Sequence, residues 1–157
     1  MRFSLIDRIS SLEAGRKITT VKLLSLAEEY LQDHFPGFPV MPGVLMVEAL
    51  VQSSAWLMRH TENFEYSTVL LREAKAVKFN NFLRPGQTLE IESVIQSQNG
   101  HQYTFKANGS VDGVSTVSAR LILEQFNQKT ENPALASSDA RGVESLRKEF
   151  AVLWKGS

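Results

Sequence analysis

Residues 33–52 read DHFPGFPVMPGVLMVEALVQ, a stretch that joins three prolines and two glycines to an almost wholly apolar run. Each proline fixes its own φ angle and disfavours the helical region for the residue before it, which predicts a stiff, extended loop. Pro42 suits the first position of a helix, and from Gly43 to Met58 apolar residues occur on every side. The stretch therefore predicts a rigid loop that leads into a buried helix.

Glu48 is the only charged residue between Gly43 and Met58, and its place in a buried helix needs an explanation. Burying a polar group without a partner costs roughly 2–7 kcal/mol. Two explanations are open from the helix alone. Glu48 can pair with Gln52 one turn later, or with a cation from elsewhere, or it can be a general acid kept protonated by apolar surroundings.

The composition limits the classes of protein to consider. A chain of 157 residues suffices for one domain with a real core and is short for two. Seventeen basic and seventeen acidic residues balance, so net charge gives no reason to expect nucleic acid or an anionic membrane as partner. The absence of cysteine excludes disulfides, thiolate zinc sites and cysteine nucleophiles. With no signal-peptide core and no apolar run of membrane-spanning length, we expect a cytoplasmic protein.

The regions on either side of the motif predict an antiparallel sheet. We expect an irregular lead-in with a turn of helix over 3–9, a strand over 18–26 and a helical turn over 27–31. Apolar and polar residues alternate from Asn63 to Phe126, which is typical of strands. Turn signals divide this region into hairpins, at Arg84-Pro85-Gly86-Gln87, Asn99-Gly100 and Asp112-Gly113.

A sheet with one apolar face and a helix that is apolar all round can bury each other, which predicts an α+β fold with the sheet wrapped around the helix. The polar, small residues of 127–139 predict a flexible linker, and apolar residues at three- and four-residue spacing predict an amphipathic helix from Ala140 to Trp154. We expect this helix to pack on the domain or a neighbouring subunit, with partner binding as the alternative. The predicted division is a domain over 1–126 followed by a linker and helix over 127–157.

The three histidines show no metal-ligand spacing. His60 falls at a helix end and His101 follows a hairpin turn, so both are predicted to lie on the surface. His34 differs, because the proline-rich loop would hold it just ahead of a helix start. An imidazole there can act as a base near neutral pH.

The motif resembles the FabZ family, the β-hydroxyacyl-acyl-carrier-protein dehydratases of bacterial fatty-acid biosynthesis. The resemblance covers about residues 3 to 125. Its most specific part lies in the loop and helix, at His34-Phe35-Pro36-Gly37, Pro39, Met41-Pro42-Gly43, Glu48-Ala49 and Gln52. Further similarity lies at Leu5-Ile6-Asp7-Arg8-Ile9, Lys75-Ala76-Val77-Lys78-Phe79, Arg84-Pro85-Gly86-Gln87-Thr88-Leu89 and Val111-Asp112-Gly113.

The resemblance implies the hotdog fold, an antiparallel sheet around a long helix. It implies a homodimer with each acyl tunnel between subunits, often assembled further into a hexamer in this family, and no cofactor or metal. His34 would be the base that removes a proton from C2 of the thioester, and Glu48 of the other subunit the acid that protonates the departing hydroxyl. Backbone N–H groups of Gly43 and Val44 could stabilise the charge on the carbonyl oxygen. The remaining tunnel and loop residues would be Phe35, Pro36, Phe38, Met41, Pro42 and Gln52.

Two residues depart from the family pattern. Phe38 stands where the family usually carries a second histidine, and Asp33 stands where glycine is common. Phe38 is expected to alter loop packing or to narrow the tunnel mouth. The acyl carrier protein that the family serves would require a basic rim, for which the candidates are Arg72, Lys75, Lys78 and Arg84.

Two other functions compete with the dehydratase. A hotdog thioester hydrolase needs a carboxylate-activated water, which Glu48 alone could serve, whereas His34 in the loop favours dehydration. A non-catalytic acyl-binding protein would keep the tunnel without turnover, and the presence of both ionisable groups argues against it.

Overall fold

The computed structural model describes residues 3–156, so the outer ends of the predicted ranges, residues 1, 2 and 157, lie outside it. Within the described chain six strands form one antiparallel sheet in the order β1-β2-β4-β5-β6-β3. The strands are β1 (Arg8–Glu13), β2 (Lys17–Leu23), β3 (Thr68–Phe79), β4 (Thr88–Asn99), β5 (Gln102–Val111) and β6 (Val114–Phe126). The helices are α1 (Gly43–Thr61) and α2 (Ala136–Leu153), with short 3-10 turns η1 (Glu29–Gln32), η2 (Gln128–Thr130) and η3 (Pro133–Leu135).

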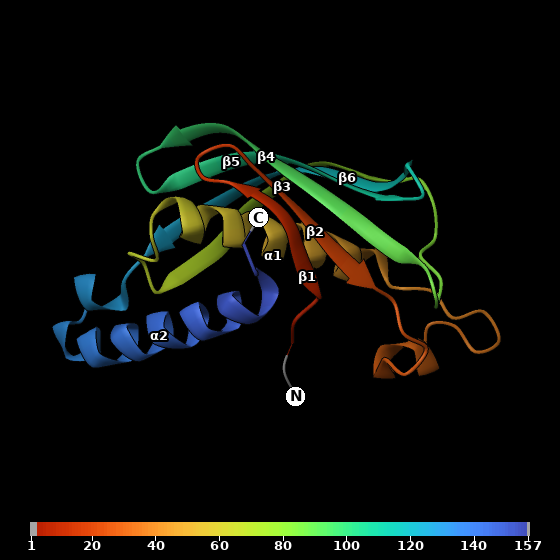
Figure 1. Cartoon of the computed structure of the whole chain (residues 1–157), viewed down its shortest axis with the longest axis horizontal. Coiled ribbons are helices and arrows are strands. Elements are labelled where there is room, and N and C mark those ends of the chain that lie inside the picture. The colour runs from red at the N-terminus through yellow and green to blue at the C-terminus, as the bar shows by residue number, and fades with distance from the viewer. Residues whose placement is uncertain (1–2, 157) are drawn as a thin grey trace.

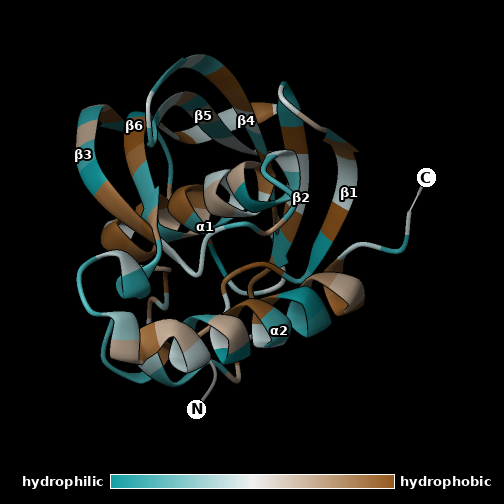
Figure 2. Cartoon of the chain, turned by 90° about the vertical axis from the view of Figure 1, so that its left-hand side faces the viewer, coloured by the Kyte–Doolittle hydropathy of each residue, from teal (hydrophilic) through white to brown (hydrophobic). Residues whose placement is uncertain are grey.

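Three layers make up the molecule. The sheet curves over α1, and α2 runs along the side of α1 that faces away from the sheet (Figure 1 and Figure 2). The α+β arrangement is the one expected from the alternating pattern and the apolar helix, and it is the hotdog fold that the family resemblance implied, with α2 as an additional element. Across residues 3–156, no helix has the length and apolar character that crossing a membrane requires.

Small and apolar side chains let α1 sit close against the sheet. Its inward face includes Ala49, Leu50 and Leu57, which are fully buried against inward-facing side chains of the sheet. Two buried hydroxyl pairs also join helix and sheet: Ser53 Oγ lies 2.8 Å from Thr20 Oγ1, and Ser54 Oγ lies 2.7 Å from Ser93 Oγ. Because buried polar groups are costly unless paired, these contacts help to define how α1 lies on β2 and β4.

The hairpin turns and the central helix agree with the sequence. Asn99-Gly100 leads into the turn between β4 and β5, and Asp112-Gly113 connects β5 to β6. Asp112 and Gly113 both have positive φ angles, 50° and 80°, as a tight hairpin turn requires. The predicted strand over 18–26 is β2, and the helical turn after it is η1.

Two predicted segments are wrong. The lead-in over 3–9 carries no helical turn; its end belongs to β1, which forms because its backbone pairs with β2. The segment 127–139 is not a flexible linker but contains η2, η3 and the first residues of α2. There Asp139 is buried and accepts hydrogen bonds from Ser67 Oγ and from the backbone N–H groups of Gln128 and Lys129.

Aromatic contacts attach the second half of α2 to the end of α1. The Phe150 ring lies 5.9 Å from that of Trp56, 5.5 Å from that of His60 and 5.2 Å from that of Phe64, measured between centroids. His60 is therefore partly buried rather than on the surface, and burial lowers its pKa. His101 is exposed, as predicted. The helix predicted to pack on the domain does so.

Candidate active site

The proline-rich loop holds His34 through its own backbone. His34 Nδ1 lies 3.0 Å from the carbonyl oxygen of Val40, and the N–H of Val40 donates to the carbonyl of His34 at 2.9 Å. Because a carbonyl can only accept, Nδ1 carries the hydrogen and Nε2 keeps a free lone pair. The His34–Phe35 peptide bond is cis, and the two rings stack with centroids 4.1 Å apart. The arrangement leaves His34 with one nitrogen able to accept a proton.

His34 lines a cavity of about 410 Å³ at the start of α1. Gly43, the first residue of α1, lines the same cavity, and the N–H groups of a first helical turn have no acceptors within the helix. They also lie at the positive end of the helix dipole. The cavity thus combines a possible base with donors for a developing negative charge, and its other walls are formed by Val40, Met41, Met46, Phe79, Asn80, Asn81 and Phe82.

Glu48 lines a second cavity, of about 270 Å³, on the outward side of α1. It accepts a hydrogen bond from Gln52 Nε2 at 3.2 Å. The Gln52 amide also bonds the N-terminal segment. Gln52 Oε1 accepts a hydrogen bond from Leu5 N at 2.8 Å, and Gln52 Nε2 donates one to Phe3 O at 3.3 Å. Gln52 therefore orients Glu48 and anchors the N-terminal segment at once. The pairing expected from the helix exists, and it is compatible with a chemical role for the carboxyl.

Within one chain, His34 and Glu48 do not share a cavity. The reason lies in the helix, where successive residues are about 100° apart. Met46 lines the same cavity as His34. Glu48 comes two residues later, which rotates it by about 200° around the helix axis, so Glu48 points to another side of α1. Within one chain the two side chains therefore face separate cavities.

Phe38, the departure from the family pattern, packs outside the His34 cavity. Its ring meets that of Phe82 edge-on at 5.6 Å, and the Arg84 guanidinium lies 5.2 Å from its centroid. Phe82 lines the His34 cavity, so Phe38 acts on the cavity wall from outside. Among the other predicted residues, Met41 is buried in that cavity and Pro42 caps α1, whereas Phe35, Pro36 and Val44 are exposed.

The basic residues proposed as a docking rim have different surroundings. Arg72 bonds Glu124, and Lys75 lies 3.6 Å from Glu73, both on exposed faces of the sheet. Arg84 lies beside Phe38 at the edge of the His34 loop. Of these, Arg84 is the one in contact with the loop.

Several lining residues escaped the sequence reasoning. Phe79 and Asn80–Phe82 line the His34 cavity, and the polar pair Asn80-Asn81, which interrupts the strand alternation, was the available signal. In the Glu48 cavity every lining residue except Glu48 and Gln52 was missed, and the missed residues include Trp56, Arg59, Leu146 and Glu149. The last two come from α2, and no local pattern relates them to Glu48.

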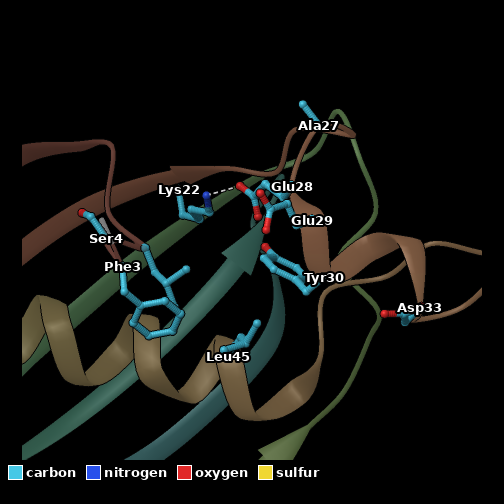
Figure 3. A pocket seen from close by; sticks show the side chains of 10 residues that line it. Phe3, Ser4, Lys22, Ala27, Glu28, Glu29, Tyr30, Asp33 and Leu45 are labelled. Carbon is cyan, nitrogen blue, oxygen red and sulfur yellow. Dashed lines mark hydrogen bonds and ion pairs between the residues drawn. The ribbon is translucent and has the colours of Figure 1, made fainter. Parts of the chain in front are cut away.

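A larger cavity, of about 600 Å³, lies under the N-terminal segment and contains neither His34 nor Glu48 (Figure 3). Its polar side is an ion pair between Lys22 and Glu28, both of them largely buried. Among the described residues, Glu28 Oε2 and Tyr30 OH are buried there without a hydrogen-bond partner.

Comparison with known proteins agrees with the fold and the loop. The FabA-like domain family matches residues 1–120. A 3-hydroxyacyl-[acyl-carrier-protein] dehydratase FabZ from Levilactobacillus brevis is 38% identical over 116 residues, which are 74% of this chain and 78% of the relative. The chain belongs to the FabZ-like family.

Other FabZ-like relatives show the same extent of similarity. The FabZ dehydratase of Caldicellulosiruptor saccharolyticus is 38% identical over 120 residues, 76% of this chain and 86% of the relative. Among solved structures, the dehydratase heterocomplex ApeI:P from Xenorhabdus doucetiae matches with a TM-score of 0.68 and 18% identity, covering 85% of this chain and 90% of that one, which supports the fold. The FabA-like match ends at residue 120, within β6, so α2 lies beyond it.

Proposed function

We propose that this FabZ-like chain dehydrates 3-hydroxyacyl-[acyl-carrier-protein] thioesters to trans-2-enoyl thioesters in fatty-acid biosynthesis. The single observation that carries the proposal is the 38% identity to FabZ dehydratases over about three quarters of the chain, within a family whose model matches residues 1–120 and so includes His34, Gly43 and Glu48. The geometry of His34 supports it, because His34 lines a cavity at a helix start and its Nδ1 is held by the carbonyl of Val40, which leaves Nε2 without that contact.

The proposed chemistry assigns one step to each group. His34 Nε2 removes a proton from C2 of the thioester, and the negative charge that develops on the carbonyl oxygen is stabilised by N–H groups of Gly43 and Val44. Glu48, in its acid form, gives its proton to the hydroxyl on C3, which leaves as water while the C2–C3 double bond forms. The reverse hydration uses the same groups.

We infer that the active unit is a homodimer joined through β3. This strand is an edge of the sheet, and it exposes Leu70, Leu71, Val77 and Phe79. Val69, near its start, lines the Glu48 cavity, and Phe79, at its end, lines the His34 cavity. Antiparallel pairing of two β3 strands about their centres would bring Val69 of one copy beside Phe79 of the other, and so join the two cavities. Assembly into a hexamer is a further possibility within the same proposal.

The proposed partner is the acyl carrier protein, and the proposed location is the cytoplasm. The same proposal divides the chain into a catalytic domain over 1–126 and an appended segment over 127–157. Arg84, beside the His34 loop, supplies positive charge for an acidic carrier, whereas Arg72 and Lys75 are paired with Glu124 and Glu73.

The test supplies a 3-hydroxyacyl carrier-protein thioester and follows the conjugated enoyl product by its absorbance and by mass. Formation of enoyl thioester and water supports the proposal. Release of free thiol and hydroxy acid without enoyl product would identify a hydrolase instead. Tight binding with neither product would identify an acyl-binding protein.

A further inference from the structure

The Glu48 cavity follows a mixed stripe along α1. Glu48, Gln52, Ala55 and Arg59 are spaced by four, three and four residues, so they lie on one face of the helix, and all four line the cavity. Eleven residues of α-helix separate Glu48 from Arg59 by about 16 Å. The cavity therefore extends from the proposed acid toward the C-terminal end of α1.

The helix α2 forms part of the wall of this cavity. It runs along the outward side of α1 (Figure 2), and its Leu146 and Glu149 line the cavity with Arg59. Its position is held at one end by the buried Asp139 and at the other by Phe150, which packs on the rings of Trp56 and His60 in α1 and of Phe64 just after it. Because α2 lies beyond the FabA-like match, this wall is an addition to the shared domain.

Arg59 makes the far end of the cavity unfavourable for an alkyl chain. Among the described residues its Nε is buried without a hydrogen-bond partner, and its guanidinium lies 4.8 Å from the Trp56 ring centroid. Burial lowers the pKa of Arg59 to about 10, and the charge of Glu149 acts in the opposite direction. A charged group in this position needs water or a polar partner, and an apolar chain that displaced water from it would leave the cation unsolvated.

We propose, on the basis of the dehydratase function proposed above, that α2 and Arg59 limit the acyl chain and make short- to medium-chain 3-hydroxyacyl thioesters the substrates. With the C3 hydroxyl at Glu48, the rest of the chain extends into the cavity of about 270 Å³. At roughly 30 Å³ for each water-sized group, this volume holds about nine groups. Counted from C4, nine groups reach C12, so chains beyond about twelve carbons must displace Leu146 or meet Arg59.

The experiment measures kcat/KM for carrier-protein thioesters of increasing chain length. For the wild-type protein we expect a fall of about tenfold or more in kcat/KM once chains exceed about twelve carbons. Leu146→Ala removes three carbons from the wall and should raise the long-to-short ratio by about tenfold. The matched control is Val152→Ala on the same helix, because Val152 is 64% exposed and does not line the cavity. It should leave the ratio unchanged, and thermal melting checks that both variants fold.

A second variant tests the polar end separately from the volume. Arg59→Met keeps a long side chain but removes the charge. The ratio of kcat/KM for long acyl chains to kcat/KM for short acyl chains should therefore rise. A wild-type profile that does not fall with chain length would overturn the inference. Equal ratios in Leu146→Ala and Val152→Ala would do the same.

Binding separates this inference from the proposed function. His34→Ala protein, which cannot carry out the proposed proton removal, is titrated calorimetrically with the same thioesters. The role of α2 is supported if long chains bind His34→Ala more weakly than short chains and if adding Leu146→Ala to His34→Ala restores the binding of long chains. This support holds even if the wild-type protein turns over no substrate. Absence of turnover would contradict the dehydratase proposal alone. If the protein turned over acyl chains of every length at the same rate and bound them equally well, only the role of α2 would be contradicted.

Discussion

Phe38, where the sequence analysis noted a departure from the family resemblance, packs against a wall residue of the His34 cavity. Its edge-on contact with Phe82 is of a kind worth about 0.5–1.5 kcal/mol, and the Arg84 guanidinium over the Phe38 ring adds a cation–π contact. The sequence predicted that Phe38 alters loop packing or narrows the tunnel mouth. The structure locates its effect on the outer side of a wall residue of the His34 cavity.

Gly43 has no room for a side chain. A Cβ at this position would lie 2.9 Å from Cε1 of the Phe79 ring, so Gly43→Ala must move either the ring or the first turn of α1. Since a displacement of about 1 Å can cost about a hundredfold in rate, we expect kcat/KM to fall by about ten- to a hundredfold while the protein remains folded. The control is Gly142→Ala in α2, whose Cβ would lie 4.0 Å from Ser67 Cβ. Wild-type activity in Gly43→Ala would show that the glycine is not required.

At the scale of elements, α2 depends on one buried carboxylate. Burial opposes ionisation of Asp139, but hydrogen bonds from Ser67 Oγ and from the N–H groups of Lys129 and Gln128 outweigh it, and the pKa of Asp139 lies below its ordinary value of 3.8. A group with a lowered pKa stabilises the folded state above its ordinary pKa. This contribution is lost as the pH falls through the folded-state value.

We therefore expect Asp139→Asn to lower the melting temperature by a few degrees at neutral pH, because a neutral amide accepts fewer and weaker hydrogen bonds. The difference from the wild type should shrink as the pH falls below about 3.8. Thermal melts of both proteins across this range make the measurement. Glu144→Gln, in an exposed pair on α2, is the control and should melt with the wild type. A difference that does not change with pH would contradict the charged role of Asp139.

For the whole molecule, the separation of His34 and Glu48 within one chain leads to a test by mixing. His34→Ala and Glu48→Gln should each lower kcat by about 10²- to 10⁴-fold. When the two variants are coexpressed, random pairing makes half of the dimers mixed, and each mixed dimer has one site with both wild-type groups. About a quarter of wild-type activity should then return. No recovery, in mixed dimers confirmed by differential tags, would mean that His34 and Glu48 do not act across subunits.

The sequence by itself determined the loop, the central helix and most of the strands. Proline, glycine and alternating apolar residues act on their immediate neighbours, so their signals are local and readable. The family, and with it the interest in His34 and Glu48, also followed from one continuous stretch. These features needed no knowledge of what lies across the fold.

Only the tertiary structure decided the features that depend on distant partners. β1 forms because it pairs with β2, and the segment before α2 is ordered because Asp139 meets Ser67, 72 residues away in the chain. The same holds for the Glu48 cavity, where Leu146 and Glu149 come from a helix that the sequence treated as an appendage. Contacts of this kind produce no periodic pattern in the sequence. Each residue fits the pattern of its own helix or strand, and tertiary packing decides which residues come into contact.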